Sequence, residues 1–422
     1  MSVESLEKQH IADAIKNTVT DEDVNLVAQK YTNNKTVQVL KYDIGNYSEG
    51  SLGFLGSHRN LKVTLQRSDA SNPETVSFFV KSMPYDCKEQ ADFLSSEGIF
   101  IKESNFFNAI VPLLERYCES EKWHATCYLA KDDSMILEDL RYQGYNVLSK
   151  TFDDTLAIKS VLACFARFHS CSILAEHYIN RNSKKQTTLN EQYPGYFDEK
   201  VFVQTSKIVR WIKCGEDLAC LLAKHLGYNP NNIRKAYDQV YKILGPSKTH
   251  RNVVCHGDPW SNNIMFADNS PLYKCILVDF QIVRYGPLVM DILQFLHLKA
   301  TRTYREKHEK DLLKLYYSIL KETIERNDST KSVGIPTLEE ILIAMDDMRL
   351  LGLVTAVQYF PISMLDAKVA ADCTKDSDSY NHFLFVDRIT TTLAHMKVNN
   401  FYKKSIEEAV IELAEKCESL FE

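Results

Sequence analysis

Residues 253–266 read VVCHGDPWSNNIMF, and this stretch carries the most information about the fold. One apolar run leads directly into His256 and Asp258, and a second apolar run begins directly after Asn263. Pro259 favours a turn between the two runs. The pattern therefore predicts two short buried strands, joined by a loop that presents histidine, aspartate and asparagine side chains.

A further apolar run, KCILVDF at residues 274–280, ends in Asp279, 21 residues after Asp258. We expect this run to be the hairpin partner of the strand that follows Asn263, so that Asp279 lies opposite Asn263. A cation that prefers oxygen ligands can then lie between those two residues, while Asp258 points toward an acceptor hydroxyl. Magnesium fits such a sparse site, because it keeps water ligands and takes others from nucleotide phosphates. The alternative, that Asp258 and Asn263 only cap turns, does not explain an acid at the end of an apolar strand.

The first third of the chain alternates between strand-like segments and turn residues. The strand-like segments are rich in β-branched and aromatic residues, and one helix over about residues 96–117 interrupts them. After residue 140, apolar residues recur mostly at helical spacing. The expected strands cover residues 36–45, 61–66, 75–83, 126–130 and 134–140, and the clearest later helices cover residues 154–174, 232–244 and 337–366.

These elements predict an α+β fold with two lobes, which is the default for a chain of 422 residues. Residues 1–139 are expected to form a small antiparallel sheet with one key helix, preceded by a peripheral helix within residues 1–30. Residues 140–422 are expected to form a large, mainly helical lobe. The cleft between the lobes then lies near Glu138 and Leu140.

Composition excludes several classes of function. A net charge of -6 and a pI near 6.1 argue against a general nucleic-acid or anionic-membrane binder. The N-terminus lacks the apolar core of a signal peptide, and the longest apolar stretch, near residues 350–357, is too short to span a bilayer. The cysteines form no CxxC pair and the histidines no HExxH motif. We therefore predict a cytoplasmic protein with reduced cysteines, no zinc site and no membrane span.

Three short motifs carry a family resemblance. The motif H-G-D-x-W-x-x-N at residues 256–263, D-F-Q at 279–281 and E-D-L at 138–140 resemble the ecdysteroid kinase-like (CHK kinase-like) proteins, which are common in insects. That family belongs to the aminoglycoside phosphotransferase and choline kinase branch of the protein-kinase-like fold. The resemblance covers about residues 35–400 and is most specific at residues 253–291.

The resemblance assigns roles to the loop residues. Asp258 would orient the acceptor hydroxyl and accept its proton, and Asn263 and Asp279 would hold magnesium on the phosphates of ATP. His256 would fix the loop through hydrogen bonds rather than act as an acid or base. His169, in ARFHS, is better explained as a packed helix residue than as a catalytic one.

The same resemblance requires a lysine and a glutamate in the N-terminal lobe. Lys81 ends the strand-like run FFVK, and Glu103 lies in FIKESNFFNAIVP, which resembles a segment of the family. Lys81 would hold the α and β phosphates while Glu103 holds Lys81. Glu138 and Leu140 would form a hinge whose backbone reads the adenine edge, although a plain acidic turn explains the side chains equally well. Asp291 would brace the catalytic loop, or cap the following helix.

The chain departs from the family pattern in three places. The glycines of residues 50–56 do not have the G-x-G-x-x-G spacing of a phosphate-covering loop. Gln281 replaces the glycine of D-F-G, which argues against regulation by flipping of that segment. The sequence YGP at 285–287 follows Asp279 so closely that no long peptide-docking segment fits. A small molecule is therefore the expected acceptor, and no protein substrate is expected.

The leading prediction is an ATP- and Mg²⁺-dependent O-kinase for a small molecule. By resemblance, the acceptor is an ecdysteroid, another steroid, or a foreign alcohol or phenol, and the role is hormone inactivation or detoxification. The side chains of Trp211, Trp260, Tyr359 and Phe360 either wall an apolar acceptor pocket or belong to the core.

Three alternatives remain. A choline or ethanolamine kinase would need an acid and an aromatic cage for the amine. A nucleotide-binding pseudokinase that serves as an interaction module has no need of Asp258. A metal-dependent phosphoesterase would need further histidines at fixed spacing, which the sequence lacks.

Overall fold

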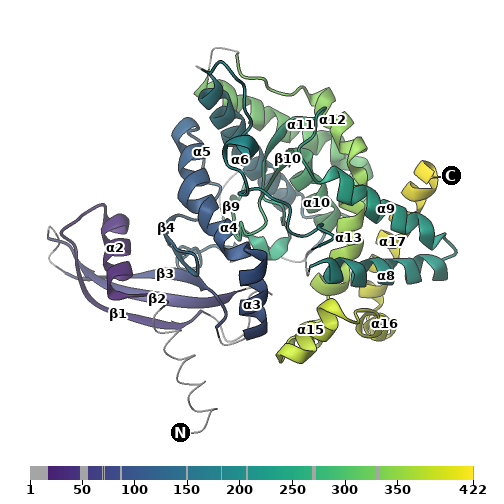
Figure 1. Cartoon of the computed structure of the whole chain (residues 1–422), viewed down its shortest axis with the longest axis horizontal. Coiled ribbons are helices and arrows are strands. Elements are labelled where there is room, and N and C mark those ends of the chain that lie inside the picture. Colours follow the sequence, from purple (N-terminus) through teal and green to yellow (C-terminus); the bar gives the residue numbers. More distant parts are fainter. Residues whose placement is uncertain are drawn as a thin grey trace, which may run out of the picture.

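The structure is a computed structural model that describes residues 18–47, 56–68, 70, 72–85, 88–148, 151–181, 183–205, 208–268, 272–328 and 332–421. A five-stranded sheet lies at one end of the molecule, at the left of Figure 1, and helices build most of the remainder. This arrangement confirms the predicted α+β fold, with a small antiparallel sheet followed by a large helical part. The division into lobes at residues 139 and 140 stays a proposal, supported by the end of the last strand of the sheet at Glu138.

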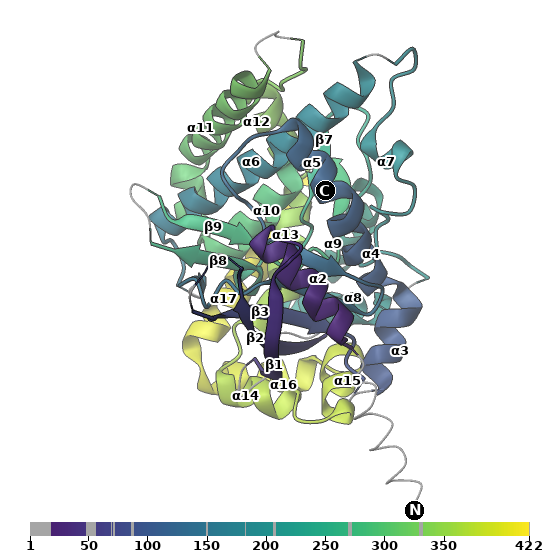
Figure 2. The same cartoon turned by 90° about the vertical axis from the view of Figure 1, so that its left-hand side faces the viewer.

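The sheet is built from β1 (Gln38–Asn46), β2 (Ser57–Gln66), β3 (Glu74–Ser82), β4 (Cys127–Ala130) and β5 (Ser134–Glu138). Its order is β1-β2-β3-β5-β4, and all neighbours are antiparallel. Side chains alternate between the two faces of a strand. In β3, Phe78 and Val80 therefore pack with helix α2 (Asp21–Thr32), which lies across the sheet in Figure 2. Phe79 and Lys81 point to the opposite face, toward the helical part.

The described part of the predicted N-terminal helical segment contains helix α2. The expected peripheral helix fell within residues 1–30, of which residues 1–17 lie outside the described part of the chain. Helix α2 starts at a capping box, in which Thr20 Oγ1 accepts from the N–H of Asp23 and the Asp23 carboxylate accepts from the N–H of Thr20. Its apolar residues then cover one face of the sheet.

The helix predicted over residues 96–117 is divided in the structure. It consists of α4 (Ile99–Asn105), a π-helical turn (Phe106–Ile110) and α5 (Val111–Tyr117), with α3 (Lys88–Glu97) before Gly98. Pro112 has no N–H to donate to the preceding turn, and the N–H of Val111 bonds to Phe106 O instead. The prediction of one regular α-helix was therefore wrong in this detail, while the position of the helical segment is confirmed.

The helical part contains two small sheets, β7 with β10 and β6-β8-β9. The strands of these two sheets are short and lie among helices (Figure 1). The strands are β6 (Asn146–Val147), β7 (Asn252–Cys255), β8 (Ile264–Ala267), β9 (Lys274–Leu277) and β10 (Arg284–Pro287). The helices are α6 (Thr155–Asn180), α7 (Leu189–Gln192), α8 (Val209–His225), α9 (Pro230–Ile243), α10 (Val289–Lys299), α11 (Arg302–Asn327), α12 (Leu338–Asp347), α13 (Arg349–Ser363), α14 (Ala367–Cys373), α15 (Ser377–Phe385), α16 (Ile389–Val398) and α17 (Asn400–Phe421).

Helix α6 is a long apolar helix of 26 residues. Within the described residues it is the single helix with the length and composition of a membrane span, and 83% of its most apolar window is buried inside the protein. Helices α13 and α14 would pass the same test only as a pair, and they are bent by 89°. Such burial is typical of the core helix of a folded domain.

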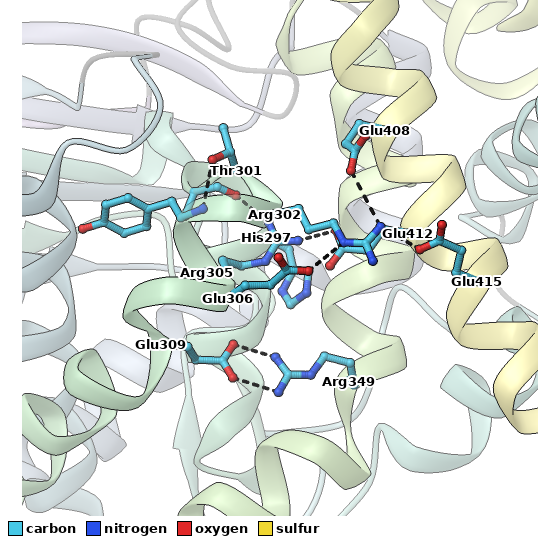
Figure 3. A network of polar contacts seen from close by, with 12 residues as sticks. His297, Thr301, Arg302, Arg305, Glu306, Glu309, Arg349, Glu408, Glu412 and Glu415 are labelled. Atoms are coloured by element: carbon cyan, nitrogen blue, oxygen red, sulfur yellow. Dashed lines mark hydrogen bonds and ion pairs between the residues drawn. The ribbon is translucent and has the colours of Figure 1, made fainter.

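Ion pairs fix the C-terminal helices to the rest of the helical part (Figure 3). Arg302 and Arg305 of α11 both reach carboxylates of α17, and Arg305 binds Glu412 there. Arg349, at the start of α13, forms a bidentate pair with Glu309 of α11 at 2.6 and 2.8 Å. Bidentate pairs of this kind are directional as well as strong. Helix α13 is thus held at its beginning, which matters because its other end lines the site.

Candidate functional site

The loop singled out in the sequence connects strands of two different sheets. Strand β7 leads into it and pairs with β10, whereas β8 leaves it and pairs with β9. Between them, Gly257 has φ +85° and residues Ser261–Asn263 form a 3-10 turn. The predicted strand-loop-strand order is confirmed. The left-handed backbone at Gly257 turns the chain so that Asp258 points into a cleft.

Asp291 holds the first part of this loop. Its carboxylate accepts from the backbone N–H groups of His256 at 2.7 Å and Gly257 at 2.9 Å. The His256 ring accepts at Nδ1 from the N–H of Asp258 (3.2 Å), so Nε2 carries the proton and donates to Val278 O (2.9 Å). The ring therefore links the loop to the chain after β9. These bonds fit the predicted role of His256, which is to hold the loop in place by hydrogen bonds.

Asp291 does not cap its helix. Leu288 occupies the N-cap position of α10 and Asp291 is the third residue of the helix, so the capping alternative was wrong. His169 of α6 binds Asp291 at 3.2 Å and Tyr316 at 2.8 Å, and it is fully buried. Burial acts to raise the pKa of Asp291, but the hydrogen bond and charge of His169 and the backbone donors outweigh it, so this pKa lies below its usual range.

His169, Asp291 and Cys255 form a buried group with ligand atoms within 4.8 Å of one another. Each of these atoms is already engaged, since the Cys255 thiol reaches backbone carbonyls at 3.6 to 3.8 Å. Burial raises the pKa of Cys255 well above its usual value, which keeps it a thiol rather than the thiolate that a metal requires. The group therefore supports the loop.

Asp258 has both carboxylate oxygens occupied. Oδ1 accepts from the Tyr359 hydroxyl at 2.6 Å, and Oδ2 accepts from Asn263 Nδ2 at 2.9 Å. Burial is the main reason that the pKa of Asp258 lies above its usual value, and the bond from Tyr359 partly opposes this rise. The sequence placed Asp258 and Asn263 in one site, which the structure shows, but it gave no sign of the contact with Tyr359.

Lys81, Glu103 and Asp279 meet on the cleft side of the sheet. Lys81 Nζ lies 2.5 Å from Glu103 Oε2 and 2.6 Å from Asp279 Oδ1. The other oxygen of Glu103 accepts from the N–H of Phe280 at 2.9 Å. Burial acts to lower the pKa of Lys81, but the two carboxylates outweigh it and raise this pKa. The predicted contact between Lys81 and Glu103 is present, while the roles of both residues toward a nucleotide stay predictions.

Asp279 lies one residue beyond the position that we expected. Strands β8 and β9 pair with Ile264 opposite Leu277, so Val278 rather than Asp279 is opposite Asn263. Asp279 has φ +68°, a left-handed conformation that costs a non-glycine residue about 1–3 kcal/mol. Strain of this kind clusters at functional sites, and here it turns the Asp279 carboxylate toward Lys81.

The donors near Asp279 fit a hard cation. Asn263 contributes an amide oxygen and Asp279 a carboxylate, whose Oδ2 accepts only a long bond of 3.3 Å from Gln281 Nε2. Oxygen donors without histidine or cysteine suit Mg²⁺, which needs few protein ligands when phosphates supply the rest.

Glu138 and Leu140 line the cavity, but the Glu138 side chain is engaged elsewhere. It binds Lys122 and accepts from the N–H of Thr126 at 2.9 Å. The carbonyl of Leu140 accepts from the N–H of Tyr145 at 2.9 Å, which closes the turn after β5. These contacts favour the acidic-turn alternative for the side chain, and the adenine-reading role of the backbone stays a proposal.

The sequence analysis named Asp139 only as part of the E-D-L hinge motif, and it did not single out His58. Asp139 is buried and accepts from Ser77 at 2.5 Å, Asn60 at 3.1 Å and Tyr47 at 2.7 Å, which ties the turn after β5 to β2 and β3. His58 lies opposite Lys81 in the β2–β3 pairing, and burial, followed by the charge of Lys81, lowers its pKa to about 4. A neutral imidazole therefore lines the cleft beside the lysine.

The predicted phosphate-covering loop falls mostly outside the described residues. Of residues 50–56 the structure describes Gly56, which has φ +105°. A Cβ at Gly56 would lie 3.6 Å from Lys81 Cε, so this end of the loop passes directly over the lysine.

A cavity of about 510 Å³ joins these groups to an aromatic wall. Lys81, Glu103 and Asp279 line one end, and Asp258 lies between the two ends. The far end is lined by Trp211, Trp260, Tyr359, Ile362, Tyr380 and Leu384. Of the four aromatic residues noted in the sequence, Phe360 belongs to the core, where it packs edge-on against Phe152.

Substitution of Gly257 by alanine is expected to be much more costly than the same change at Gly227. Both glycines have left-handed backbones, with φ +85° and +92°. A Cβ at Gly257 would lie 2.3 Å from Ile282 O, whereas nothing lies within 4 Å of one at Gly227. We expect Gly227→Ala to cost about 1–2 kcal/mol for the backbone alone, and Gly257→Ala to cost roughly 1–3 kcal/mol more for the clash. Urea unfolding of both variants measures this, and equal losses would contradict it.

The comparisons with solved structures found chains of low identity. Similar chains include a complex of gentamicin with APH(2″)-IIa (12% identity, TM-score 0.33, covering 80% of this chain and 95% of that one). They also include a microcompartment-associated aminopropanol kinase (12% identity, TM-score 0.32, covering 91% of this chain and 99% of that one). A choline/ethanolamine kinase family protein from Mesorhizobium loti is similar too (10% identity, TM-score 0.33, covering 83% of this chain and 90% of that one). All three TM-scores are low, so the family to which the chain belongs rests on its match to a sequence family.

No curated protein matches this chain. The ecdysteroid kinase-like family matches residues 54–328, which is more than half of the chain and includes Lys81, Glu103, Asp258, Asn263 and Asp279. This match supports a kinase-like enzyme that acts on a small molecule. The chain therefore belongs to the ecdysteroid kinase-like family.

Proposed function

We propose that the protein is an ATP- and Mg²⁺-dependent kinase that phosphorylates a hydroxyl group of an apolar small molecule. The observation that carries this proposal is the single cavity with Lys81, Glu103 and Asp279 at one end, Asp258 in the middle and aromatic side chains at the other end. Phosphate-binding groups and a proton-accepting carboxylate thus open onto the same space.

Each residue has a part in the transfer. Lys81 would bind the α and β phosphates, and Glu103 would hold both Lys81 and the backbone of Phe280 in place. Asn263 and Asp279 would hold magnesium, which neutralises phosphate charge when bound. Asp258 would orient the acceptor hydroxyl and take its proton while the acceptor oxygen attacks the γ-phosphorus and ADP leaves. Catalysis would then come mainly from positioning and charge neutralisation.

The lining of the far end favours an uncharged acceptor. Among the described residues that line the cavity, the acids are Glu103, Glu138, Asp258 and Asp279, and only Asp258 adjoins the aromatic wall. A quaternary amine would need aromatic faces with a nearby carboxylate, and Asp258 is committed to the hydroxyl. A cavity of about 510 Å³ is within the usual range for small-molecule sites. The arrangement therefore favours an ecdysteroid, another steroid, or a foreign alcohol or phenol over choline or ethanolamine.

The test uses the purified full chain with ATP and Mg²⁺ and a panel of sterols, phenols, choline and aminoglycosides, with products detected by mass spectrometry. A matched pair sharpens the test, because 3,3-dimethylbutan-1-ol has the shape of choline without its charge. We expect phosphorylation of neutral alcohols or phenols, preference for the neutral member of the pair, and loss of product when EDTA removes the metal. Phosphorylation of choline alone would favour the amine kinase alternative.

A second measurement, combined with the product assay, separates an enzyme from a pseudokinase. Calorimetric titration with ADP and Mg²⁺ reports binding whether or not the reaction takes place. Binding without product from any acceptor would support a nucleotide-binding interaction module. Absence of binding would overturn the nucleotide site itself.

We also propose a cytoplasmic location, which fractionation of the source cells would test.

A further inference from the structure

Tyr359 occupies the position on Asp258 where an acceptor hydroxyl is expected. Its phenolic O–H donates to Asp258 Oδ1 at 2.6 Å, and Asn263 Nδ2 donates to the other oxygen at 2.9 Å. Each oxygen of the carboxylate thus has a charge-assisted hydrogen bond from within the protein. An acceptor hydroxyl directed at Oδ1 would compete with Tyr359 for this oxygen.

The Tyr359 ring belongs to the acceptor end of the cavity. It contacts Trp211 edge-on at 5.4 Å and Trp260 at 6.4 Å between ring centroids, and all three side chains line the cavity. A ring alcohol or phenol placed among these side chains would direct its hydroxyl at the same carboxylate oxygen. Tyr359 therefore resembles the expected acceptor both in its chemistry and in its place.

The helix that carries Tyr359 is weakened next to it. Pro361 lies inside α13, and because proline has no N–H, the carbonyl of Val357 receives no helical bond from it. The chain also bends by 89° between α13 and α14. One helical bond is thus missing beside Tyr359, although side chains bond the carbonyls of Gln358 and Pro361 at 3.3 and 2.7 Å. The Tyr359 side chain lines a cavity with room to receive it.

The backbone at Trp211 is anchored by two side chains. The backbone carbonyl of Trp211 accepts from Gln358 Nε2 at 2.8 Å and from Arg388 Nη2 at 3.2 Å. Arg388 is fully buried and also lies over the Trp211 ring, 5.3 Å from its centroid. Because Gln358 precedes Tyr359 in α13, the bond from its side chain ties this helix to Trp211. Release of Asp258 by Tyr359 would therefore need a rotation of the tyrosine side chain and no movement of the helix.

We propose that Tyr359 is an internal stand-in for the acceptor, which keeps water away from Asp258 until the acceptor displaces it. The inference rests on the proposed kinase function. Water is a competing acceptor for every kinase: its oxygen would attack the γ-phosphorus, its proton would pass to Asp258, and ADP would leave with loss of ATP. The Tyr359 phenol, held on Asp258, excludes this water. When the acceptor binds, its hydroxyl replaces that of Tyr359 as the hydrogen-bond donor to Asp258 Oδ1.

A purely orienting role for Tyr359 predicts the opposite behaviour. If the tyrosine stayed on Oδ1 during catalysis, it would position the carboxylate for an acceptor that binds beside it. Loss of the hydroxyl would then lower the rate of transfer without admitting water. The two roles therefore differ in the sign of the effect on acceptor-free hydrolysis.

The test is Tyr359→Phe, which removes the hydroxyl and keeps the ring. With ATP and Mg²⁺ but no acceptor, we expect ADP formation to rise about tenfold or more above wild type. With an acceptor, we expect its KM to fall several-fold while kcat changes little, because the acceptor no longer displaces a bound donor. The control is Tyr304→Phe, which removes a hydroxyl bonded to Thr155 on the surface of α11 and should change neither rate. Adding Asp258→Asn to Tyr359→Phe should abolish the extra hydrolysis.

Two groups of outcomes would overturn the inference. Transfer to an acceptor by the wild type, with acceptor-free ADP formation unchanged or kcat strongly reduced in Tyr359→Phe, would overturn it and leave the proposed function intact. Phosphate found on Tyr359 itself by mass spectrometry would do the same, because the residue would then be a substrate. Failure of wild type and variant alike to form ADP or a phosphorylated product would overturn the inference together with the proposed function.

Discussion

Replacement of Asp258 by asparagine is expected to lower phosphoryl transfer by about 10²- to 10⁴-fold, the usual contribution of a positioned proton acceptor. Asparagine has the same shape and keeps one oxygen for Tyr359, but it cannot take a proton. The pKa of Asp258 is raised mainly by burial, so the charged carboxylate is costly to fold and its removal should not unfold the protein. The expected loss is therefore one of kcat, with the affinity for ADP and the thermal unfolding temperature nearly unchanged.

Steady-state kinetics and calorimetry on Asp258→Asn measure these quantities. Asp268→Asn is the matched control, because Asp268 follows β8 only ten positions later and is exposed to solvent. Retention of more than a tenth of wild-type kcat in Asp258→Asn would exclude this aspartate as the proton acceptor.

Lys81→Met is expected to remove nucleotide binding and to destabilise the fold at the same time. Glu103 is fully buried, and loss of its cation would leave an uncompensated charge at a cost of about 3–5 kcal/mol. Asp279 is less affected, because 27% of its side chain is exposed and water can solvate it. Loss of the cation that faces the phosphates would also weaken ADP binding in the presence of Mg²⁺ by at least ~10-fold, since a hydrogen bond to a charged group contributes about 1.5–3 kcal/mol.

A double variant separates the two effects. Lys81→Met with Glu103→Gln leaves no buried charge, so we expect most of the lost stability to return while nucleotide affinity stays low. Urea unfolding and calorimetric titration of the single and double variants measure this. Lys62→Met on the neighbouring strand, where the side chain is exposed, should alter neither quantity. A double variant that is no more stable than Lys81→Met would show that the pair is not the source of the loss.

The sequence was most informative where one chemical requirement left a single solution. The family resemblance called for a lysine on a strand and a glutamate on the helix, and an acid among apolar residues at Glu103 supported Lys81 as its partner, so their contact was predictable. The catalytic loop was predictable because two apolar runs enclosed a polar segment with fixed spacing.

Other features depended on contacts that no local pattern reveals. Tyr359 lies 101 residues from Asp258 and sits in an apolar helix, where a tyrosine is most simply explained as a packed side chain. Strand β10 reads RYGP, and glycine with proline suggests a turn, yet pairing with β7 makes it a strand. Asp139 satisfies three donors brought together only by the folded sheet. The described structure was needed for each of these.

The cavity is assembled from two separate parts of the chain, and this division has an evolutionary consequence. The groups for phosphate lie between Lys81 and Asp279, whereas much of the aromatic wall comes from residues 359–385, beyond the end of the family match at residue 328. Mutations in α13 to α15 at positions other than Tyr359, which contacts Asp258, can therefore remodel part of the wall without altering Lys81, Glu103 or Asp279. We expect related enzymes to diverge fastest in α13 to α15, and an exchange of this segment between two of them to carry acceptor preference along with it.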